Sequence, residues 1–293
     1  FLAHPDLGYI NESRFSLLKY LSVYNLNPPG QTAIVVYTDR PQLFEIFIPF
    51  FEQFHIQQVT PGQIKAWQGS INYVHRTKTE VVKNFFQQFG GNLIFLDTDT
   101  YITKPIDTLW SEIGLGEVYM QQSEGVIDGS RNKVFKKWDN FLKNSNIQYN
   151  DQKFSYSPNF EVWNSGMIGI SQQLAPVFDD VLHLTDAIHA QFPKHITEQL
   201  SCSYILQQHA TLKPAASYMV HYWNLKEFRQ FLNQFFKKNE EESIPNLVKL
   251  VHPIDVATIQ QEKEAYEDLP LHKKWMAMVT GNKWRIDTYI KKL

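Results

Sequence analysis

The sequence predicts an α/β fold with a mostly parallel central sheet, flanking helices and a helical C-terminal extension. Two apolar runs, AIVVY at residues 33–37 and LIFL at residues 93–96, are typical of strands that are buried on both faces. Segments with helical periodicity stand between and around these runs. Strand and helix signals that alternate in this way indicate a parallel sheet wrapped by helices.

The N-terminal third supplies these elements in order. FLAH at residues 1–4 suits the end of a strand. ESRFSLLKYL at residues 12–21 carries apolar side chains at helical spacing, with Asn11 in the N-cap position. TEVVKNFFQQFGG at residues 79–91 predicts another helix, because its apolar side chains share one stripe and its glycine pair suits a left-handed C-terminal cap.

The rest of the chain differs in amino-acid composition from the N-terminal third. Residues 119–159 are polar and aromatic, and we expect this insertion to carry specificity. EVWNSGMIGI at residues 161–170 predicts a strand, a long helix is expected from about Gln172 to Gln191, and a shorter helix follows Thr197. The remaining segments are a strand or loop at 217–223, an amphipathic helix at 224–238, a solvated break at 239–243 and a basic, aromatic tail from 271.

Composition limits the functions that the chain can have. Its 293 residues, 43% of them hydrophobic, can form one large or two small domains. A formal net charge of −2 argues against a nucleic-acid partner. The single cysteine, Cys202, excludes an internal disulfide and fits a reducing compartment, so we expect a cytoplasmic location. We expect neither a membrane-spanning segment nor a signal peptide, because no apolar run reaches about 18 residues and residues 1–9 lack a leader pattern.

Asp97 and Asp99 follow the LIFL run directly. In an extended strand, side chains two residues apart point to the same side, so the two carboxylates would share one small volume. Like charges this close repel, and a hard divalent cation such as Mg²⁺ or Mn²⁺ relieves the repulsion. The end of a parallel strand is also where open α/β sheets bind ligands. The pair therefore predicts a metal site for a phosphorylated ligand; the alternative is that Asp97 caps the strand and Asp99 begins a turn.

Three other classes of phosphate- or metal-binding protein fit the sequence around Asp97 and Asp99 less well. A phosphatase of the haloacid-dehalogenase kind needs Thr or Val two places after the second aspartate, where this chain has Tyr101. A P-loop protein needs GxxxxGK followed by Ser or Thr, and an EF-hand continues as DxDxDG. Neither pattern occurs in the sequence.

Five segments occur in an order that is typical of one family. They are YVHRTKTEVVKNFF (73–86), LIFLDTDTYITKP (93–105), VWNSGMIGIS (162–171), HITEQLSCSYIL (195–206) and VHYW (220–223). With them the chain resembles nucleotide-sugar glycosyltransferases of the GT-A fold and is similar to glycosyltransferase family 8 and its bacterial relatives. The resemblance implies a Rossmann-like GT-A catalytic domain at 1–223 and a helical extension at 224–293. The nucleotide-sugar half would span about 1–105 and the acceptor half about 106–223.

The resemblance assigns the metal site to Asp97, Asp99 and His221, with Mn²⁺ or Mg²⁺ as the cofactor and Asp97 also at the ribose or diphosphate of the donor. Imidazole is an acceptable ligand for Mn²⁺, so the third position makes chemical sense. Taken alone, His221 reads as an ordinary half-buried histidine. The Gly-Lys-Pro-Trp end of the family motif is not reproduced after Trp223, and Lys226 is either a substitute for its diphosphate contact or a plain surface lysine.

Further donor contacts are implied in the N-terminal half. Arg76, with Lys78 as the near alternative, would face the donor sugar or diphosphate, because a guanidinium donates two parallel hydrogen bonds to such a group. The alternative is an ordinary surface arginine at a helix start. The loops after the first two strands, at Ala3 and His4 and at Asp39, would hold the nucleotide base.

On the acceptor side, the resemblance points to Asn164 and Gly166 and to the pair Glu198 and Gln199. Asn164 would hydrogen-bond a sugar hydroxyl or lie in a strand bulge, and a strand glycine such as Gly166 indicates a close approach of the backbone. Glu198 and Gln199 stand where the family has an Asp-Gln pair near the anomeric carbon. The alternative is that Thr197 is only an N-cap and Glu198 a first-turn carboxylate.

The predicted function is metal-dependent transfer of a hexosyl group from a UDP-sugar to a hydroxyl of a glycan, glycolipid or protein acceptor. The resemblance implies retention, with Glu198 as a nucleophile or as a stabiliser of an oxocarbenium-like state. An inverting enzyme would need a base, for which Glu198, Asp128 and Asp151 are candidates. Two alternatives are a non-catalytic sugar-nucleotide binding protein and a sugar-phosphate nucleotidyltransferase, which HPDLGYINESR at residues 4–14 fits poorly with its single glycine.

The C-terminal tail at residues 270–293 mixes cations with aromatic side chains. Such a mixture predicts peripheral membrane contact with anionic lipid. The alternative is a helix that packs its tryptophans onto the catalytic domain. The residues concerned are Lys273, Lys274, Trp275, Met276, Trp284, Arg285, Tyr289, Lys291 and Lys292.

Overall fold

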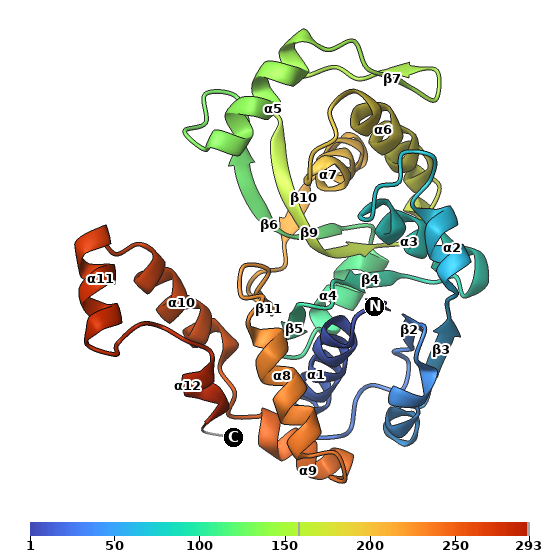
Figure 1. The fold of residues 1–293 in the computed structure, drawn as a ribbon. Coiled ribbons are helices and arrows are strands. Elements are labelled where there is room, and N and C mark those ends of the chain that lie inside the picture. Colours follow the sequence, from blue (N-terminus) through green and yellow to red (C-terminus); the bar gives the residue numbers. More distant parts are fainter. Residues whose placement is uncertain (158, 292–293) are drawn as a thin grey trace. The chain divides into compact units, whose positions relative to one another are not determined.

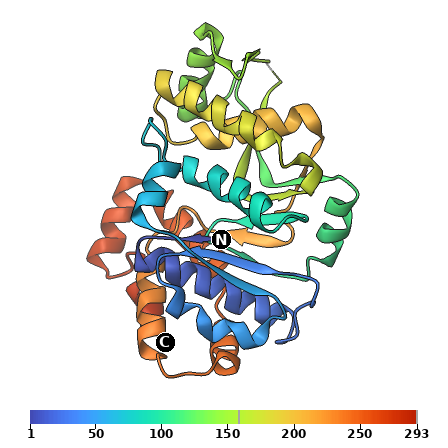
Figure 2. The same cartoon turned by 90° about the vertical axis from the view of Figure 1, so that its right-hand side faces the viewer.

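The computed structural model describes residues 1–157 and 159–291 and has the mixed α/β architecture that the sequence predicts (Figure 1 and Figure 2). The chain divides into two compact units, and each takes segments from distant parts of the sequence. Unit 1 comprises Phe1–Gln58, Asp97–Pro105 and Tyr218–Leu293, and unit 2 comprises Val59–Leu96 and Ile106–Ser217. The predicted domain boundary at residue 223 stays a prediction.

Unit 1 contains a three-stranded sheet in the order β1-β2-β3. β1 (Leu2–Ala3) pairs in parallel with β2 (Ile34–Thr38), and β2 pairs in parallel with β3 (Phe54–Gln58). The prediction of parallel strands is confirmed for this sheet, and the carboxyl ends of its strands therefore lie at one edge. Two short 3-10 helices connect β2 to β3, at Pro41–Leu43 and Glu45–Phe50.

The helices of unit 1 bury an aromatic core. Helix α1 (Leu7–Val23) packs against α8 (Phe228–Lys238), α9 (Ile244–Val251) and β5 (Thr100–Ile102). The ring of Phe15 on α1 meets rings on β5 and α8 edge-on, at centroid distances of 5.6 and 5.4 Å. This packing joins segments more than 200 residues apart in the sequence into one unit.

The start of α1 differs from the prediction. Asp6 is the N-cap, because its Oδ1 accepts a hydrogen bond from the backbone N–H of Gly8. The prediction of Asn11 as the N-cap was wrong. Asn11 is buried inside the helix, where its side-chain amide donates to Asn233 of α8. In the sequence alone, an asparagine that bonds to another helix cannot be distinguished from an asparagine that caps its own helix.

Unit 2 contains a four-stranded sheet in the order β10-β6-β9-β4. Its strands are β10 (Leu212–Pro214), β6 (Val118–Val126), β9 (Glu161–Ile170) and β4 (Leu93–Leu96). β10 runs parallel to β6, but β9 is antiparallel to both β6 and β4. The expectation of a parallel arrangement was therefore wrong for β4. An apolar run identifies a buried strand, but it does not give the direction of the strand's neighbour.

Helices form in the three segments of unit 2 where the sequence predicts them, and three further helices, at residues 61–67, 107–114 and 133–144, were not predicted. The long helix expected from about Gln172 begins instead at Val177, because Pro176 cannot donate a backbone hydrogen bond and serves as the N-cap. Gly90 and Gly91 have φ of 68° and 80°, as the predicted left-handed cap requires. The elements are α2 (Pro61–Trp67), α3 (Arg76–Gln88), α4 (Asp107–Gly114), α5 (Lys133–Asn144), hairpin strands β7 (Gln148–Tyr149) and β8 (Gln152–Lys153), a 3-10 helix (Gln172–Leu174), α6 (Val177–Gln191) and α7 (Thr197–His209).

The predicted helical extension is confirmed, and it belongs to unit 1. After α9 the chain forms α10 (Val256–Glu267), α11 (Leu271–Val279) and α12 (Asp287–Ile290). No residue of α11 is buried, and Leu271 and Trp275 are 85% and 63% exposed. Trp284 is half-buried, and the Nζ of Lys263 lies 5.9 Å from its ring centroid. Within residues 1–157 and 159–291, no helix has both the length and the apolar character that crossing a membrane requires.

Candidate metal centre

Asp97 and Asp99 lie in a tight turn. Strand β4 ends at Leu96, and the backbone N–H and hydroxyl of Thr100 both donate to the carbonyl oxygen of Asp97, at 3.3 and 2.6 Å. The expectation that an extended strand presents both carboxylates was wrong. The turn brings them together instead, because hydrogen bonds across residues 97–100 fold the backbone back on itself. Local hydrogen bonding by Thr100 therefore positions both side chains.

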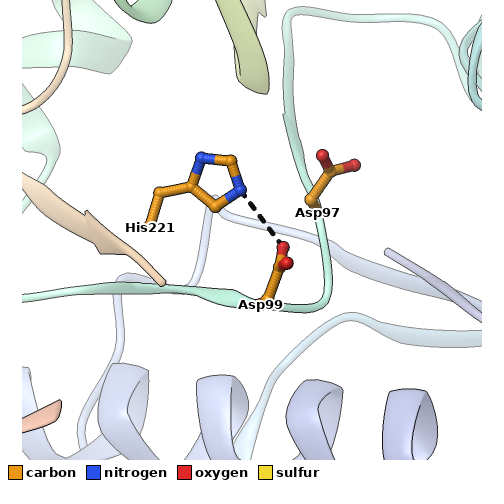
Figure 3. Close-up of side chains that lie close together, drawn as sticks. All are labelled: Asp97, Asp99 and His221. Carbon is orange, nitrogen blue, oxygen red and sulfur yellow. Dashed lines mark ion pairs between the residues drawn. The ribbon is translucent and has the colours of Figure 1, made fainter. Parts of the chain in front are cut away.

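The third member of the cluster comes from a distant strand of the same unit. β11 (Met219–His221) pairs antiparallel with β5, with His221 opposite Thr100, and the N–H of Tyr222 donates to the carbonyl of Asp99 at 3.0 Å. This pairing places His221 Nε2 3.3 Å from Asp99 Oδ1. Figure 3 shows the imidazole of His221 close to both aspartate side chains, with its ion pair to Asp99 as a dashed line.

The cluster offers the donor types that a divalent cation requires. One potential ligand atom from each of Asp97, Asp99 and His221 lies within 4.8 Å of the other two, and all three side chains are half-buried. The buried Nδ1 of His221 has no hydrogen-bond partner among the described residues. Two carboxylate oxygens and one imidazole nitrogen suit Mn²⁺, whereas Mg²⁺ prefers oxygen ligands. The residues present therefore fit a divalent metal.

A buried carboxylate lies next to this turn. Glu12 of α1 is 1% exposed, and its two oxygens accept hydrogen bonds from Thr98 Oγ1 and Arg229 Nε, each at 3.0 Å. The pKa of Glu12 is raised from 4.5 to about 7, mainly by burial and also by the charge of Asp99, against the opposing effects of Arg229 and Thr98. Glu12 thus ties the centre of the turn to helices α1 and α8. The sequence contains no local signal for this role, because both partners are remote in the chain.

The residues predicted to bind the nucleotide base meet at the ends of β1 and β2. Ala3 is buried in β1, and His4 Nε2 lies 3.7 Å from Asp39 Oδ2. Burial lowers the pKa of His4, and the charge of Asp39 partly restores it. Asp39 Oδ1 is buried and has no hydrogen-bond partner among the described residues. Lys226 is exposed in the loop before α8. These residues belong to unit 1.

The other predicted donor contacts belong to unit 2 and bond to other residues of that unit. Arg76 donates to Asp186, Glu80 and the carbonyl of Trp67, at 2.8, 2.6 and 2.8 Å. Lys78 donates to the carbonyl and the hydroxyl of Ser165, at 2.9 and 3.1 Å. The assignment of Arg76 and Lys78 to donor binding stays a prediction.

Glu198 lies in the first turn of α7 and is 3% exposed. Its oxygens accept hydrogen bonds from Ser165 Oγ at 3.0 Å and from Cys202 Sγ at 3.2 Å, and Lys78 Nζ lies 3.8 Å away. The ion pair with Lys78 and the hydrogen bond from Ser165 thus link α3 and β9 to α7. Thr197 is inside the helix, and the N-cap position belongs to Ile196, so the alternative of Thr197 as the cap was wrong.

The other acceptor-side candidates divide into two groups. Asn164 and Gln199 lie together in unit 2, because their side-chain amides both donate to Glu124, at 2.8 and 2.9 Å. Asp128 instead forms an ion pair with Lys143 at 2.5 Å, and Asp151 lies in the turn of the β7–β8 hairpin with φ of 59°. The structure therefore brings together one pair of the predicted catalytic residues around a carboxylate that the sequence motifs did not single out.

The chain was compared with known families, proteins and structures. No protein-family model matches it, and no curated protein matches it. Among solved structures, it is similar to mouse xyloside xylosyltransferase 1 in its apo form, with 12% sequence identity and a TM-score of 0.43 over 71% of this chain and 79% of that one. A likeness at this level assigns no activity, so the function rests on the chemistry of the residues themselves.

Proposed function

We propose that the chain is a metal-dependent glycosyltransferase that moves a hexosyl group from a UDP-sugar to an acceptor hydroxyl with retention of the anomeric configuration. The observation that carries the proposal is the convergence of Asp97, Asp99 and His221 on one small volume. Two carboxylates and an imidazole from a turn and a paired strand form a ligand set for Mn²⁺. The resemblance of the surrounding segments to family 8 supports nucleotide-sugar chemistry.

In this proposal, Asp97, Asp99 and His221 hold the cation, which supplies a Lewis acid where charge develops on the leaving diphosphate. The turn at 97–100 and the pairing of β11 with β5 keep the three side chains in place before the donor binds. The buried hydrogen bond from Thr98 to Glu12 restrains the same turn. The protein therefore bears little reorganisation cost when the cation and the diphosphate bind.

Uridine binding is assigned to the carboxyl ends of β1 and β2. Ligands of open α/β sheets bind outside such strand ends. Asp39 offers a half-buried carboxylate whose Oδ2 lies 3.7 Å from His4 Nε2. This carboxylate would accept a hydrogen bond from a ribose hydroxyl or a base N–H. Lys226 would add positive charge for the diphosphate from its exposed loop.

On the acceptor side, Gln199 is the candidate for direct contact with the sugar, because it is half-exposed, whereas Glu198 is buried. Glu198 would anchor Ser165 and Lys78 and so stabilise the backbone of β9 next to α7. A buried, fully bonded carboxylate is a poor nucleophile. We therefore assign Glu198 to structure and electrostatics within unit 2 and leave the sugar contact to its neighbour.

The proposal is tested by a donor screen. UDP-, GDP- and CDP-sugars are incubated with the protein and Mn²⁺, nucleotide release is measured, and the anomer of the product is determined by NMR. We expect release of UDP from a UDP-hexose and a retained anomer. Asp99→Asn should abolish the metal-dependent release, whereas the control Asp268→Asn, at the exposed end of α10, should not.

Two outcomes would reject the proposal. Equal turnover by wild type and Asp99→Asn would remove the metal assignment. Release of pyrophosphate from UTP and a sugar phosphate, without transfer from any UDP-sugar, would favour the nucleotidyltransferase instead.

A further inference from the structure

Glu124 joins two predicted site residues through one carboxylate. Asn164 Nδ2 donates to Glu124 Oε1 at 2.8 Å, and Gln199 Nε2 donates to Glu124 Oε2 at 2.9 Å. The three residues come from β9, α7 and β6, which are separate elements of unit 2. We call this group, Glu124 with Asn164 and Gln199, the amide clamp.

The backbone of β6 places Glu124 at an irregularity of the sheet. Ser123 pairs with Trp163 and Gly125 pairs with Val162, so Glu124 is an extra residue on β6 that has no partner in the register. Gly125 has φ of 97°, a conformation that side-chain-bearing residues rarely adopt. Such a bulge turns one side chain away from the regular alternation of the strand. The bulge therefore sets the side of the strand from which the exposed Glu124 side chain leaves the backbone.

The chemistry of the clamp sets the orientation of both amides. A carboxylate only accepts hydrogen bonds, so both NH₂ groups must face Glu124. The carbonyl oxygen of Asn164 accepts from the backbone N–H of Gly166 at 2.8 Å, which engages both ends of that amide within unit 2. The side-chain amide of Gln199, in contrast, is held in this group only through its NH₂ end, by Glu124. Its carbonyl oxygen is consequently on the side that faces away from Glu124.

This orientation matters for the reaction proposed above. Glycosyl transfer passes through a state with positive charge at the anomeric carbon and ring oxygen. An amide oxygen near such a charge stabilises it, whereas an amide NH₂ destabilises it, because fixed dipoles act where charge develops. A Gln199 that rotated by half a turn would present the wrong end.

We propose that Glu124 is a positioning residue for glycosyl transfer, which fixes the Gln199 amide with its carbonyl oxygen outward and uses Asn164 as the second anchor of the clamp. The inference rests on the proposed function for its catalytic consequence, but the clamp itself is independent of that function. Asn164 is then a positioning residue as well, because its two polar ends bond to Glu124 and to Gly166.

Two single variants and their combination test the clamp. In Glu124→Gln, the single carbonyl oxygen at 124 can accept from only one of the two amides. Because the N–H of Gly166 holds Asn164 in place, the NH₂ group at 124 faces Gln199, and the orientation of Gln199 is lost. In Asn164→Asp, two carboxylates face each other. The double variant restores a complete chain: the Gln199 NH₂ donates to the new carbonyl at 124, and the new NH₂ at 124 donates to the carboxylate at 164. That carboxylate can still accept from Gly166.

We expect each single variant to lower kcat by about 10- to 100-fold with the KM for the UDP-sugar nearly unchanged, and the double variant to recover most of the loss. Glu161→Gln is the matched control, because this carboxylate lies on β9 and accepts from the hydroxyl of Ser123 rather than from the amides. It should keep the wild-type kcat. A wild-type kcat in Glu124→Gln, or a double variant as slow as the single ones, would overturn the proposal.

NMR provides a readout that does not depend on activity. The side-chain NH₂ resonances of Asn164 and Gln199 should shift in Glu124→Gln and stay in place in Glu161→Gln. If the wild type transfers no sugar yet these resonances shift as expected, the clamp stands and the proposed function fails. If transfer occurs but the resonances do not respond to Glu124→Gln, the clamp is wrong.

Discussion

The buried carboxylate of Glu12 makes a quantitative prediction about stability. Its pKa is raised from 4.5 to about 7, first by burial and then by the charge of Asp99. Because the folded state keeps this proton to a higher pH than the unfolded state, it binds more protons between pH 4.5 and 7, and the free energy of unfolding falls as pH rises through that window. A difference of about 2.5 pH units corresponds to about 3 kcal/mol, since each unit is about 1.4 kcal/mol.

The perturbation is Glu12→Gln, which retains the size of the side chain but removes the titration. Unfolding free energies of wild type and variant are measured by urea denaturation from pH 4.5 to 8, with a chelator present so that no metal contributes. The variant loses the ion pair with Arg229, which changes its stability at every pH. The informative quantity is therefore how the difference between the two proteins changes with pH.

We expect the variant to gain about 3 kcal/mol relative to wild type between pH 4.5 and 8. Glu240→Gln, an exposed carboxylate between α8 and α9, should show a nearly constant difference from wild type over the same range. A Glu12→Gln difference that does not change with pH would refute the reasoning. It would mean that the Arg229 and Thr98 contacts hold the pKa of Glu12 near its ordinary value.

Two further predictions concern the nucleotide and the tail. Asp39→Asn should weaken UDP binding about 10- to 100-fold, the cost of losing a hydrogen bond to a charged group, and leave Mn²⁺ binding intact. Isothermal titration calorimetry would measure the loss of UDP affinity, and an unchanged UDP affinity would remove Asp39 from the proposed nucleotide site. Deleting 270–293, which includes the exposed face of α11, should reduce co-sedimentation with anionic liposomes. Equal pelleting of both proteins would dismiss the membrane role.

The sequence was informative about where the elements lie and less so about how they pair. Apolar runs located β2, β4 and β9, because a strand buried on both faces needs such a run. They could not show that β9 runs antiparallel to its neighbours, since direction depends on contacts with distant segments. The start of α6 moved because Pro176 outweighs helical periodicity.

For the candidate site as well, the sequence identified residues better than it identified the contacts that position them. Asp97, Asp99 and His221 were named from motif order, and the structure brings their side chains together. The turn that does so depends on hydrogen bonds of Thr100, which the extended-strand reading did not consider. Glu12 and Glu124 were missed for physical reasons. Glu12 is defined by an ion pair across 217 residues, and Glu124 is defined by a bulge in the strand register.

The central claim is that the Asp97–Asp99–His221 cluster holds a divalent cation for a uridine diphosphate. The most direct measurement is a Mn²⁺ titration followed by electron paramagnetic resonance, with and without UDP, on wild type, Asp99→Asn and the control Asp268→Asn. The account predicts one Mn²⁺ bound in the presence of UDP by wild type and by the control, and a loss of affinity of about tenfold or more in Asp99→Asn. Equal Mn²⁺ affinity in all three proteins would contradict it.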